Sequence, residues 1–333
     1  MLAQRVSSIN SISAICEETG ADVGEVGRAV GSDARIGGAF LRAGLGFGGS
    51  CFKKDVLSLA YLADSVGLAG VAEYWRQVVA MNEDQRDRFS RRVVRCLNNT
   101  LVGKKLTFLG YAFKANTSDV RESPTSDVVR RLLSERPREI AIFDPCCDPA
   151  VVRRDIGMIL QDPSVVGRGA CPVVVYSDVY EACEASNAVI VTTECDQFRN
   201  KEPKAALCPA RRKSRDRFDV GRFTRQGQSG MDILDCHGPF LWSSPVLAHE
   251  GEDPLPGLAE EPSCDEDCPE CEAIKMGGRK AGGHGAAENV DWHKIAYRMT
   301  KPKWLFDGRG IIDAEEMAKL DVHVEIIGSQ GKA

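Results

Sequence analysis

The sequence lacks any long hydrophobic run, and it has no excess of positive charge. No stretch of its 333 residues approaches the roughly 18 consecutive apolar residues that a membrane-spanning helix needs, so we expect no membrane partner. The formal net charge is −5, which argues against a surface whose main role is to bind nucleic acid. The apolar positions of residues 1–20 are interrupted by Arg5, Ser7 and Asn10, so they do not predict a secretory signal.

Cysteine is plentiful, but a disulfide pattern is missing. The 13 cysteines are an odd number, and they are spread along a chain with no predicted secretion signal. We therefore expect reduced thiols and a cytoplasmic protein, in which most cysteines act as small buried apolar residues.

The first hundred residues have the apolar spacing of helices. The stripe of the first predicted helix is Val6, Ile9, Ile12 and Cys16. Gly20 is a natural end for it, and Asp22 is expected to cap a second helix that ends at Gly31. We expect Ser50 to cap a third helix that runs to Gly67.

A long segment, 71–97, contains neither glycine nor proline and predicts one long helix. Its apolar stripe is Val71, Tyr74, Trp75, Val78, Phe89, Val93 and Cys96. Because Asn82 and Arg86 interrupt this stripe, the helix could line an interface. A solvent-covered helix of a bundle is an equal alternative.

After Gly103 the pattern becomes that of strands alternating with helices. The expected strands are 105–109, 139–143, 172–176, 188–192, 304–307 and 322–327, with helices near 126–134 and 180–184. This alternation predicts a parallel sheet with both faces covered. The expected fold class is α/β, with a helical central region (1–100) followed by a Rossmann-like domain (101–198 and 291–328).

Residues 199–290 break this pattern. A basic portion leads to an acidic one, glycine and proline punctuate both, and the segment predicts a long insertion of low order. Within it, Cys264, Cys268 and Cys271, with His284 further on, suggest zinc. Their irregular spacing and acidic surroundings favour the alternative, which is no metal.

The stretch GLGFGGSCFKKD, residues 44–55, is compatible with two chemistries. Gly44, Gly46 and Gly49 fit the dinucleotide-binding pattern G-x-G-x-x-G. That pattern requires a strand before its first glycine, and the preceding residues do not predict one. We therefore do not favour a dinucleotide-binding turn here.

Cys51 and Asp55 support the second interpretation. Cys51 stands at the expected start of a helix, where free backbone N–H groups favour a thiolate. Asp55 lies four residues on, on the same helix face, where its carboxylate can take a proton or position a water. A buried packing cysteine is the alternative for Cys51, and a charge that serves the helix dipole is the alternative for Asp55.

The segment 46–55 resembles the active-site cysteine segment of the UDP-glucose 6-dehydrogenase family. Other stretches resemble that family in the same order: SSINSISA (7–14), TGADV (19–23), EYWRQVVAMN (73–82), GYAFKANTSDVRESP (110–124), YEAC (180–183) and FDGR (306–309). The resemblance covers about residues 1–198 and 291–328, and several ordered motifs make it specific.

The resemblance implies an oxidoreductase that converts the C6 alcohol of UDP-glucose into a carboxylate with two NAD⁺, without releasing the aldehyde. It implies that Cys51 attacks the aldehyde, that the resulting thiohemiacetal becomes a thioester, and that water hydrolyses the thioester. Such covalent capture splits one difficult step into two easier ones. Asp55 is implied to assist proton transfer or hydrolysis.

The resemblance also assigns binding residues. Sugar-nucleotide contacts fall on Phe40, Leu41, Arg42, Ala43, Gly44, Leu45, Gly46, Phe47, Gly48, Phe113, Lys114 and Arg309, and Arg35 reaches the substrate of a neighbouring subunit. NAD contacts fall on Cys51, Phe52, Lys53, Lys54 and Arg121. Lys114 and Arg309 have the alternative of ordinary surface cations, and Arg121 that of a local pair with Asp119 or Glu122. The 71–97 helix is similar to the family's dimer helix, which implies a homo-oligomer.

The sequence departs from the family's pattern at its start. The family begins with a Rossmann domain that carries the true G-x-G-x-x-G, and its acid–base lysine and asparagine precede the position of Met1. We therefore expect this polypeptide alone to be truncated and inactive as a dehydrogenase. The alternatives are a non-catalytic, dimerising UDP-sugar-binding fragment, or a dehydrogenase of GDP-mannose or UDP-N-acetylmannosamine.

Overall fold

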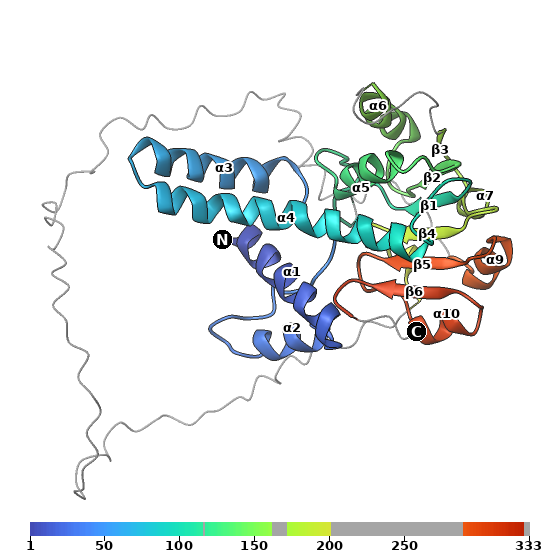
Figure 1. Ribbon diagram of the computed structural model, residues 1–333, viewed down its shortest axis with the longest axis horizontal. Helices are drawn as coiled ribbons and strands as arrows, with labels where there is room; N and C mark the ends of the chain where they lie inside the picture. The colour runs from blue at the N-terminus through green and yellow to red at the C-terminus, as the bar shows by residue number, and fades with distance from the viewer. Residues whose placement is uncertain (116, 162–171, 201–288, 330–333) are drawn as a thin grey trace, which may run out of the picture. The chain divides into compact units, whose positions relative to one another are not determined.

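The first part of the chain is helical, as the sequence predicts. The computed structural model describes residues 1–115, 117–161, 172–200 and 289–329 (Figure 1). Its first four elements are the helices α1 (Leu2–Thr19), α2 (Val23–Gly31), α3 (Ser50–Ser65) and α4 (Ala69–Cys96). Helices α3 and α4 lie side by side, and α1 packs on α4 (Figure 1).

Local signals set most of these helix ends. Gly20 ends α1 in the left-handed conformation with φ 78°. The Asp22 carboxylate accepts the backbone N–H of Glu25 at 2.9 Å and so caps α2, as predicted. The prediction that Ser50 caps α3 is wrong. Gly49 holds that position with φ 82° and ψ 158°, a conformation open to glycine, and Ser50 is the first helical residue.

The second part contains the predicted parallel sheet. Its strands are β1 (Lys105–Leu109), β2 (Glu139–Phe143), β3 (Val173–Val175), β4 (Ala188–Val191), β5 (Trp304–Asp307) and β6 (His323–Ile326). The spatial order is β3-β2-β1-β4-β5-β6, and all five pairings are parallel. The strand order reverses between β1 and β4. Sheets of this type bind ligands at such a point, beyond the carboxyl ends of the strands.

Helices cover both faces of the sheet. They are α5 (Pro124–Leu133), α6 (Pro149–Leu160), α7 (Val179–Cys183), α9 (Trp292–Arg298) and α10 (Ala314–Ala318), with a 3-10 turn at Asp196–Phe198. Successive residues of β2 show the two sides. Ile140 and Ile142 join the core under α4, α5 and α6, whereas Ala141 and Phe143 join the core under α7, α9 and α10.

Helix α4 ties the helical part to the sheet. Phe89, Val93 and Leu97 of α4 belong to the same buried core as β1 and β2. The rings of Phe89 and of Phe306 on β5 meet edge to face, with centroids 6.4 Å apart. This packing brings the loop between α2 and α3 toward the carboxyl end of β5.

Two predictions fall outside the described residues. They are the cysteine-rich zinc candidate (Cys264, Cys268, Cys271 and His284) and the insertion itself, except for its first and last residues. In the part of the chain that the structure describes, no helix is long and apolar enough to cross a membrane.

Candidate functional site

The loop before α3 is held through its backbone by buried side chains of α1 and α4. The Oδ1 atom of Asn10 on α1 accepts the N–H of Gly44 at 3.0 Å. The Nε2 atom of Gln85 on α4 donates to the carbonyl of the same glycine at 2.8 Å. Both side chains are buried. The glycine peptide therefore has fixed partners on both sides, although it belongs to no strand.

The next residues of the loop bind two more side chains of α4. Asn82 accepts the N–H of Phe47 at 2.8 Å and donates to its carbonyl at 3.1 Å. Arg86 donates to the carbonyls of Phe47 and Leu45. Gly46 lies between them with φ 93°, and an added Cβ would stand 2.2 Å from the Asn82 Oδ1. Glycine is required there both by conformation and by space.

The other side of the loop meets the α/β part. A Cβ added to Gly44 would lie 3.1 Å from the Gly308 carbonyl and 3.6 Å from the Arg309 Nη1. A Cβ added to Gly49 would lie 3.0 Å from the ring of Phe113. The structure thus brings the predicted substrate loop together with two predicted substrate residues, Phe113 and Arg309.

Arg309 is not an ordinary surface cation, which was the alternative to a substrate-binding role. Its Nε donates to the Thr192 carbonyl at 2.6 Å, and its backbone N–H donates to Asp307 at 2.8 Å. Its Nη2 is buried and has no hydrogen-bond partner among the described residues. Burial lowers the pKa of Arg309 to about 10, and its guanidinium stays charged at neutral pH. An unpaired buried donor of this kind is uncommon in proteins and fits a group that a ligand completes.

Arg42 lies near this guanidinium, and both Arg42 and Lys114 are exposed. Arg42 pairs with Glu194 at 2.9 Å and donates to the Arg309 carbonyl at 2.7 Å. Burial alone would raise the pKa of Glu194, but Arg42 and Arg199 outweigh it and hold the pKa below its ordinary value. The Nζ of Lys114 lies 5.2 Å from the Phe113 ring centroid.

Cys51 and Asp55 are the second and sixth residues of α3, and both side chains are exposed. The buried packing alternative for Cys51 is therefore wrong. The Ser50 hydroxyl lies 4.0 Å from the Cys51 Sγ. An accessible thiol in the first turn of a helix is well placed for nucleophilic chemistry.

The predicted cofactor residues surround the start of α3. Phe52 packs edge to face on Phe47, with centroids 5.7 Å apart. Lys53 lies 3.5 Å from Glu83, and Lys54 is exposed. Arg121 forms the local pair with Asp119, at 2.8 Å. That pairing lowers the pKa of Asp119.

Two further predicted substrate residues lie on the exposed part of the loop. Phe40 has φ 61° and a half-exposed ring that lies 6.4 Å from the Phe52 ring. Arg35 is largely exposed and pairs with Asp33. Leu41 and Ala43 are half-buried and pack against the core of α1 and α2, and Gly48 faces the Glu122 carbonyl.

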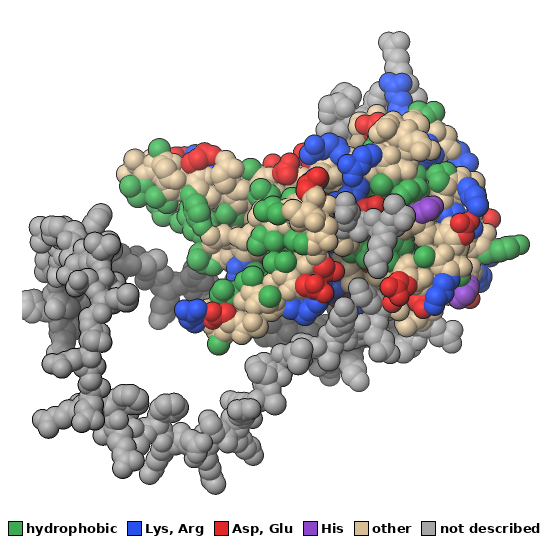
Figure 2. Space-filling view, turned by 60° about the horizontal axis from the view of Figure 1, so that its bottom comes forward, with side chains coloured by type: hydrophobic (Ala, Val, Ile, Leu, Met, Phe, Trp, Pro, Cys, Tyr) green, Lys and Arg blue, Asp and Glu red, His purple; other side chains and the backbone are tan. Residues whose placement is uncertain are grey.

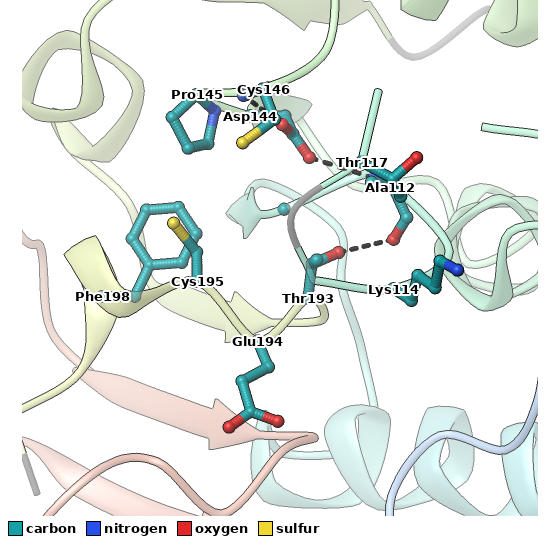
Figure 3. A pocket seen from close by; sticks show the side chains of 11 residues that line it. Ala112, Lys114, Thr117, Asp144, Pro145, Cys146, Thr193, Glu194, Cys195 and Phe198 are labelled. Carbon is teal, nitrogen blue, oxygen red and sulfur yellow. Dashed lines mark hydrogen bonds between the residues drawn. The ribbon is translucent and has the colours of Figure 1, made fainter. Parts of the chain in front are cut away.

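A small pocket lies at the carboxyl ends of β1, β2 and β4 (Figure 3). Its lining includes Asp144, Thr193 and Cys195. It has room for about one water. The Asp144 carboxylate accepts backbone N–H groups, and the Thr193 hydroxyl donates to the Ala112 carbonyl at 2.7 Å, as Figure 3 shows. Because the pocket is so small and both Asp144 and Thr193 already bond backbone groups, we place the candidate site at the glycine loop instead.

Sequence reasoning missed the side chains that hold the loop. Asn82, Gln85 and Arg86 have the i, i+3, i+4 spacing of one helix face. The polar interruption of the apolar stripe by Asn82 and Arg86 was the available signal. The solvent-covered alternative does not hold for these three side chains, because all three are buried. The prediction that the helix as a whole lines an interface stays a prediction. Within the described ranges no group of three or more candidate ligands could hold a metal ion.

Comparisons with known proteins agree with this arrangement. The model of the UDP-glucose/GDP-mannose dehydrogenase family, central domain, matches residues 1–84. The model of the UDP binding domain of the same family matches residues 107–220. The first match contains the glycine loop and Cys51, and the second contains Phe113 and Lys114.

Curated relatives and a solved structure point the same way. UDP-glucose 6-dehydrogenase 1 of Oryza sativa subsp. japonica is 45% identical over 210 residues, which cover 60% of this chain and 43% of the relative. UDP-glucose 6-dehydrogenase of Drosophila melanogaster is 47% identical over 199 residues, which cover 59% and 41%. A UDP-glucose dehydrogenase structure from Pyrobaculum islandicum is 32% identical with a TM-score of 0.50, covering 59% and 41%.

These matches span about two fifths of the length of the curated relatives. Two models of one family nevertheless match more than half of this chain. The chain therefore belongs to the UDP-glucose/GDP-mannose dehydrogenase family.

Proposed function

We propose that this chain supplies the nucleophile and the UDP-sugar-binding groups of a UDP-glucose 6-dehydrogenase. The observation that carries the proposal is the buried Nη2 of Arg309, which has no hydrogen-bond partner among the described residues. The Nη1 of the same guanidinium lies 3.6 Å from the place of a Cβ added to Gly44, in the loop that leads to Cys51. A diphosphate offers the acceptors that this donor lacks, and hydrogen bonds between charged groups are among the stronger ones in proteins.

The substrate residues form two walls of the proposed site. One wall is the loop of residues 40–48, whose glycines leave backbone close to a ligand. The other comprises Phe113, Lys114 and Arg309. Arg42 adds a second cation, although Glu194 already neutralises part of its charge. Arg35 is proposed to act on the substrate of a neighbouring subunit, which its exposure permits.

Cys51 is the proposed nucleophile. Its sulfur adds to the C6 aldehyde carbon and forms a thiohemiacetal, which holds the aldehyde until it has been oxidised to a thioester. Water then hydrolyses the thioester, releasing the carboxylate and returning the thiol. Asp55, one helical turn away on the same face, is proposed to take the proton of that water at its carboxylate.

The start of α3 fits part of a nicotinamide cofactor site. Gly49 leaves a cradle that a Cβ would fill, and its N–H donates to the Glu122 carbonyl at 3.3 Å, so the segment of Arg121 adjoins the first turn. Lys53, Lys54 and Arg121 would hold the anionic cofactor there. NAD⁺, when bound, accepts the two hydrides that the four-electron oxidation of the alcohol releases.

We also propose that these 333 residues do not suffice for hydride transfer. The G-x-G-x-x-G at 44–49 follows helices and a loop, not a strand, and so does not form a dinucleotide-binding turn among the described residues. An absorbance assay with UDP-glucose and NAD⁺ tests this point. Formation of NADH by the purified chain would contradict it.

We propose a cytoplasmic homo-oligomer joined through the helical part. All seven cysteines of the described ranges are free thiols, as expected in a reducing compartment. Apolar side chains are exposed along α3 and α4, including Leu62, Val71 and Tyr74, and Figure 2 shows apolar side chains on the surface of this part. Contiguous exposed apolar surface is typical of an interface. Light scattering measures the oligomer directly.

Calorimetry with each ligand separately tests the proposed function. We expect UDP-glucose to bind this chain and to be displaced by UDP. We expect NAD⁺ to bind weakly by comparison. GDP-mannose and UDP-N-acetylmannosamine serve as competitors that identify the sugar nucleotide. Absence of binding by all three sugar nucleotides would contradict the proposal.

A further inference from the structure

Three polar side chains of α4 are buried where the helix faces the glycine loop. Asn82, Gln85 and Arg86 are 3%, 2% and 5% exposed. Burying polar groups is costly unless they are hydrogen-bonded, and here the partners come from loop backbone. One face of α4 therefore binds the backbone of a single loop and holds its conformation.

Asn82 holds one residue of that loop from both sides. Its amide bonds both the N–H and the carbonyl of Phe47, three positions before α3 begins. Gly46 adopts φ 93° directly against the Asn82 Oδ1. This pairing replaces the strand partner that an extended segment would otherwise need, and it fixes the direction in which the chain enters α3.

Arg86 connects the same residue to the α/β part. It donates to the Phe47 carbonyl, and its other terminal nitrogen pairs with Asp127 of α5. Helix α5 begins at Pro124, and a Cβ added to Gly48 would lie 2.6 Å from that ring. Loop, α4 and α5 therefore form one bonded unit around the entry to α3.

We infer that Asn82 and Arg86 are positioning residues that fix the first turn of α3, and with it Cys51, against the substrate groups of the α/β part. They act through the backbone of Phe47. This inference rests on the proposed function, because it assigns the loop contacts to alignment of the nucleophile with the sugar.

Asn187 provides a matched control. It is also a buried asparagine that bonds backbone on both sides. Its Oδ1 accepts the Lys105 N–H at 3.0 Å, and its Nδ2 donates to the Lys301 carbonyl at 3.2 Å. It lies just before β4, at the opposite end of the strands from the candidate site. Its removal should weaken the fold without displacing Cys51.

The experiment measures how well UDP-glucose protects Cys51 from iodoacetamide, by peptide mass spectrometry of the full chain. Circular dichroism and thermal melts check the fold, and calorimetry gives the UDP affinity. In the unaltered chain we expect saturating UDP-glucose to slow alkylation of Cys51 by about tenfold or more. In Asn82→Leu we expect protection of about twofold or less, while UDP affinity stays within about threefold.

The companion variants separate positioning from general loss of structure. Asn187→Leu should keep both the protection and the UDP affinity. Asn82→Asp keeps the acceptor for the Phe47 N–H and should restore part of the protection. It also serves as the test should Asn82→Leu fail to fold.

The outcomes separate the positioning role from the proposed function. Full protection in Asn82→Leu, or equal loss in Asn82→Leu and Asn187→Leu, would overturn the positioning role and leave the proposed function intact. No UDP binding and no protection in the unaltered chain would overturn the proposed function and the positioning role together.

Discussion

The two ends of the parallel sheet bury polar groups in different ways. At the amino end, the Lys105 Nζ lies 3.0 Å from Glu139, and the Tyr176 hydroxyl donates to the same carboxylate at 2.8 Å. Asn187 joins the starts of β1 and β5 through backbone bonds. These groups satisfy one another, so this end is built for structure.

At the carboxyl end one buried donor lacks a hydrogen-bond partner among the described residues. Burial raises the pKa of Asp307, although its carboxylate accepts the N–H groups of Arg309, Gly310 and Ile312. The neighbouring Arg309 keeps an unpaired Nη2. A buried donor without a partner indicates where a ligand is expected, so changes at the carboxyl end can be compared with controls at the amino end.

The largest expected effect is on ligand binding. Arg309→Met should weaken UDP-glucose binding about 100-fold, or about 2.7 kcal/mol, because it removes charged hydrogen bonds to the diphosphate. Lys105→Met at the other end should leave the affinity unchanged. Calorimetry measures both. Binding by Arg309→Met within about threefold of the unaltered chain would contradict the assignment of the carboxyl end.

For the free energy of unfolding we expect the opposite order, with a larger loss in Lys105→Met than in Arg309→Met. Lys105→Met leaves the Glu139 carboxylate without its cation and should lower the free energy of unfolding by about 2.5 kcal/mol, somewhat less than for a fully buried pair, because Glu139 is partly exposed. Arg309→Met should cost less, since an unpaired buried donor disappears with it. Urea denaturation monitored by circular dichroism distinguishes them. A larger loss in Arg309→Met would mean that Arg309 is mainly structural.

Two glycines with positive φ provide the next comparison. Gly46→Ala forces a Cβ against the Asn82 Oδ1 and should cost about 2 kcal/mol. Gly103 precedes β1 at the amino end, and a Cβ added there in Gly103→Ala meets nothing within 4 Å. This substitution should cost about 1 kcal/mol, from backbone conformation alone. Thermal melts measure both, and equal losses would show that the Asn82 contact does not constrain the loop.

The smallest expected effect is on acid stability. The folded-state pKa of Glu194 lies below its ordinary value of 4.5, so its stabilising contribution is present above that pH and is lost as the pH falls through the folded value. Glu194→Gln should therefore lower stability at pH 7 by less than about 1 kcal/mol, since the pair is partly exposed, and should match the unaltered chain in acid.

The control for Glu194 lies at the amino end. Lys301 lowers the pKa of Asp321 across a fully exposed pair. Asp321→Asn should change stability less than Glu194→Gln over the same pH series. A pH-independent difference between Glu194→Gln and the unaltered chain would remove the ionic explanation.

The helices and strands that could be predicted from the sequence depend mainly on local patterns of apolar and capping residues. The apolar spacing of 6, 9, 12 and 16 and the capping Asp22 act within one helix, and the strands alternate with helices as parallel sheets require. Helix α6 was not predicted, although Asp148 caps it and Pro149 opens it. That signal was present and was overlooked.

The candidate site depends on contacts that spacing alone does not reveal. The resemblance to the family indicated the loop, Phe113 and Arg309, and the structure brings them together. The burial of Arg309 depends on packing between distant segments. The loop-binding role of Asn82 and Arg86 depends on which backbone meets their helix face, so their spacing on α4 could not establish it.

The most direct test of the central claim is a crystal structure of this chain with UDP-glucose. We predict that a diphosphate oxygen accepts the Arg309 Nη2 and that the sugar C6 lies about 3.5 Å from the Cys51 Sγ, a distance suited to attack. UDP-glucose bound elsewhere, or with its sugar turned away from Cys51, would contradict the account.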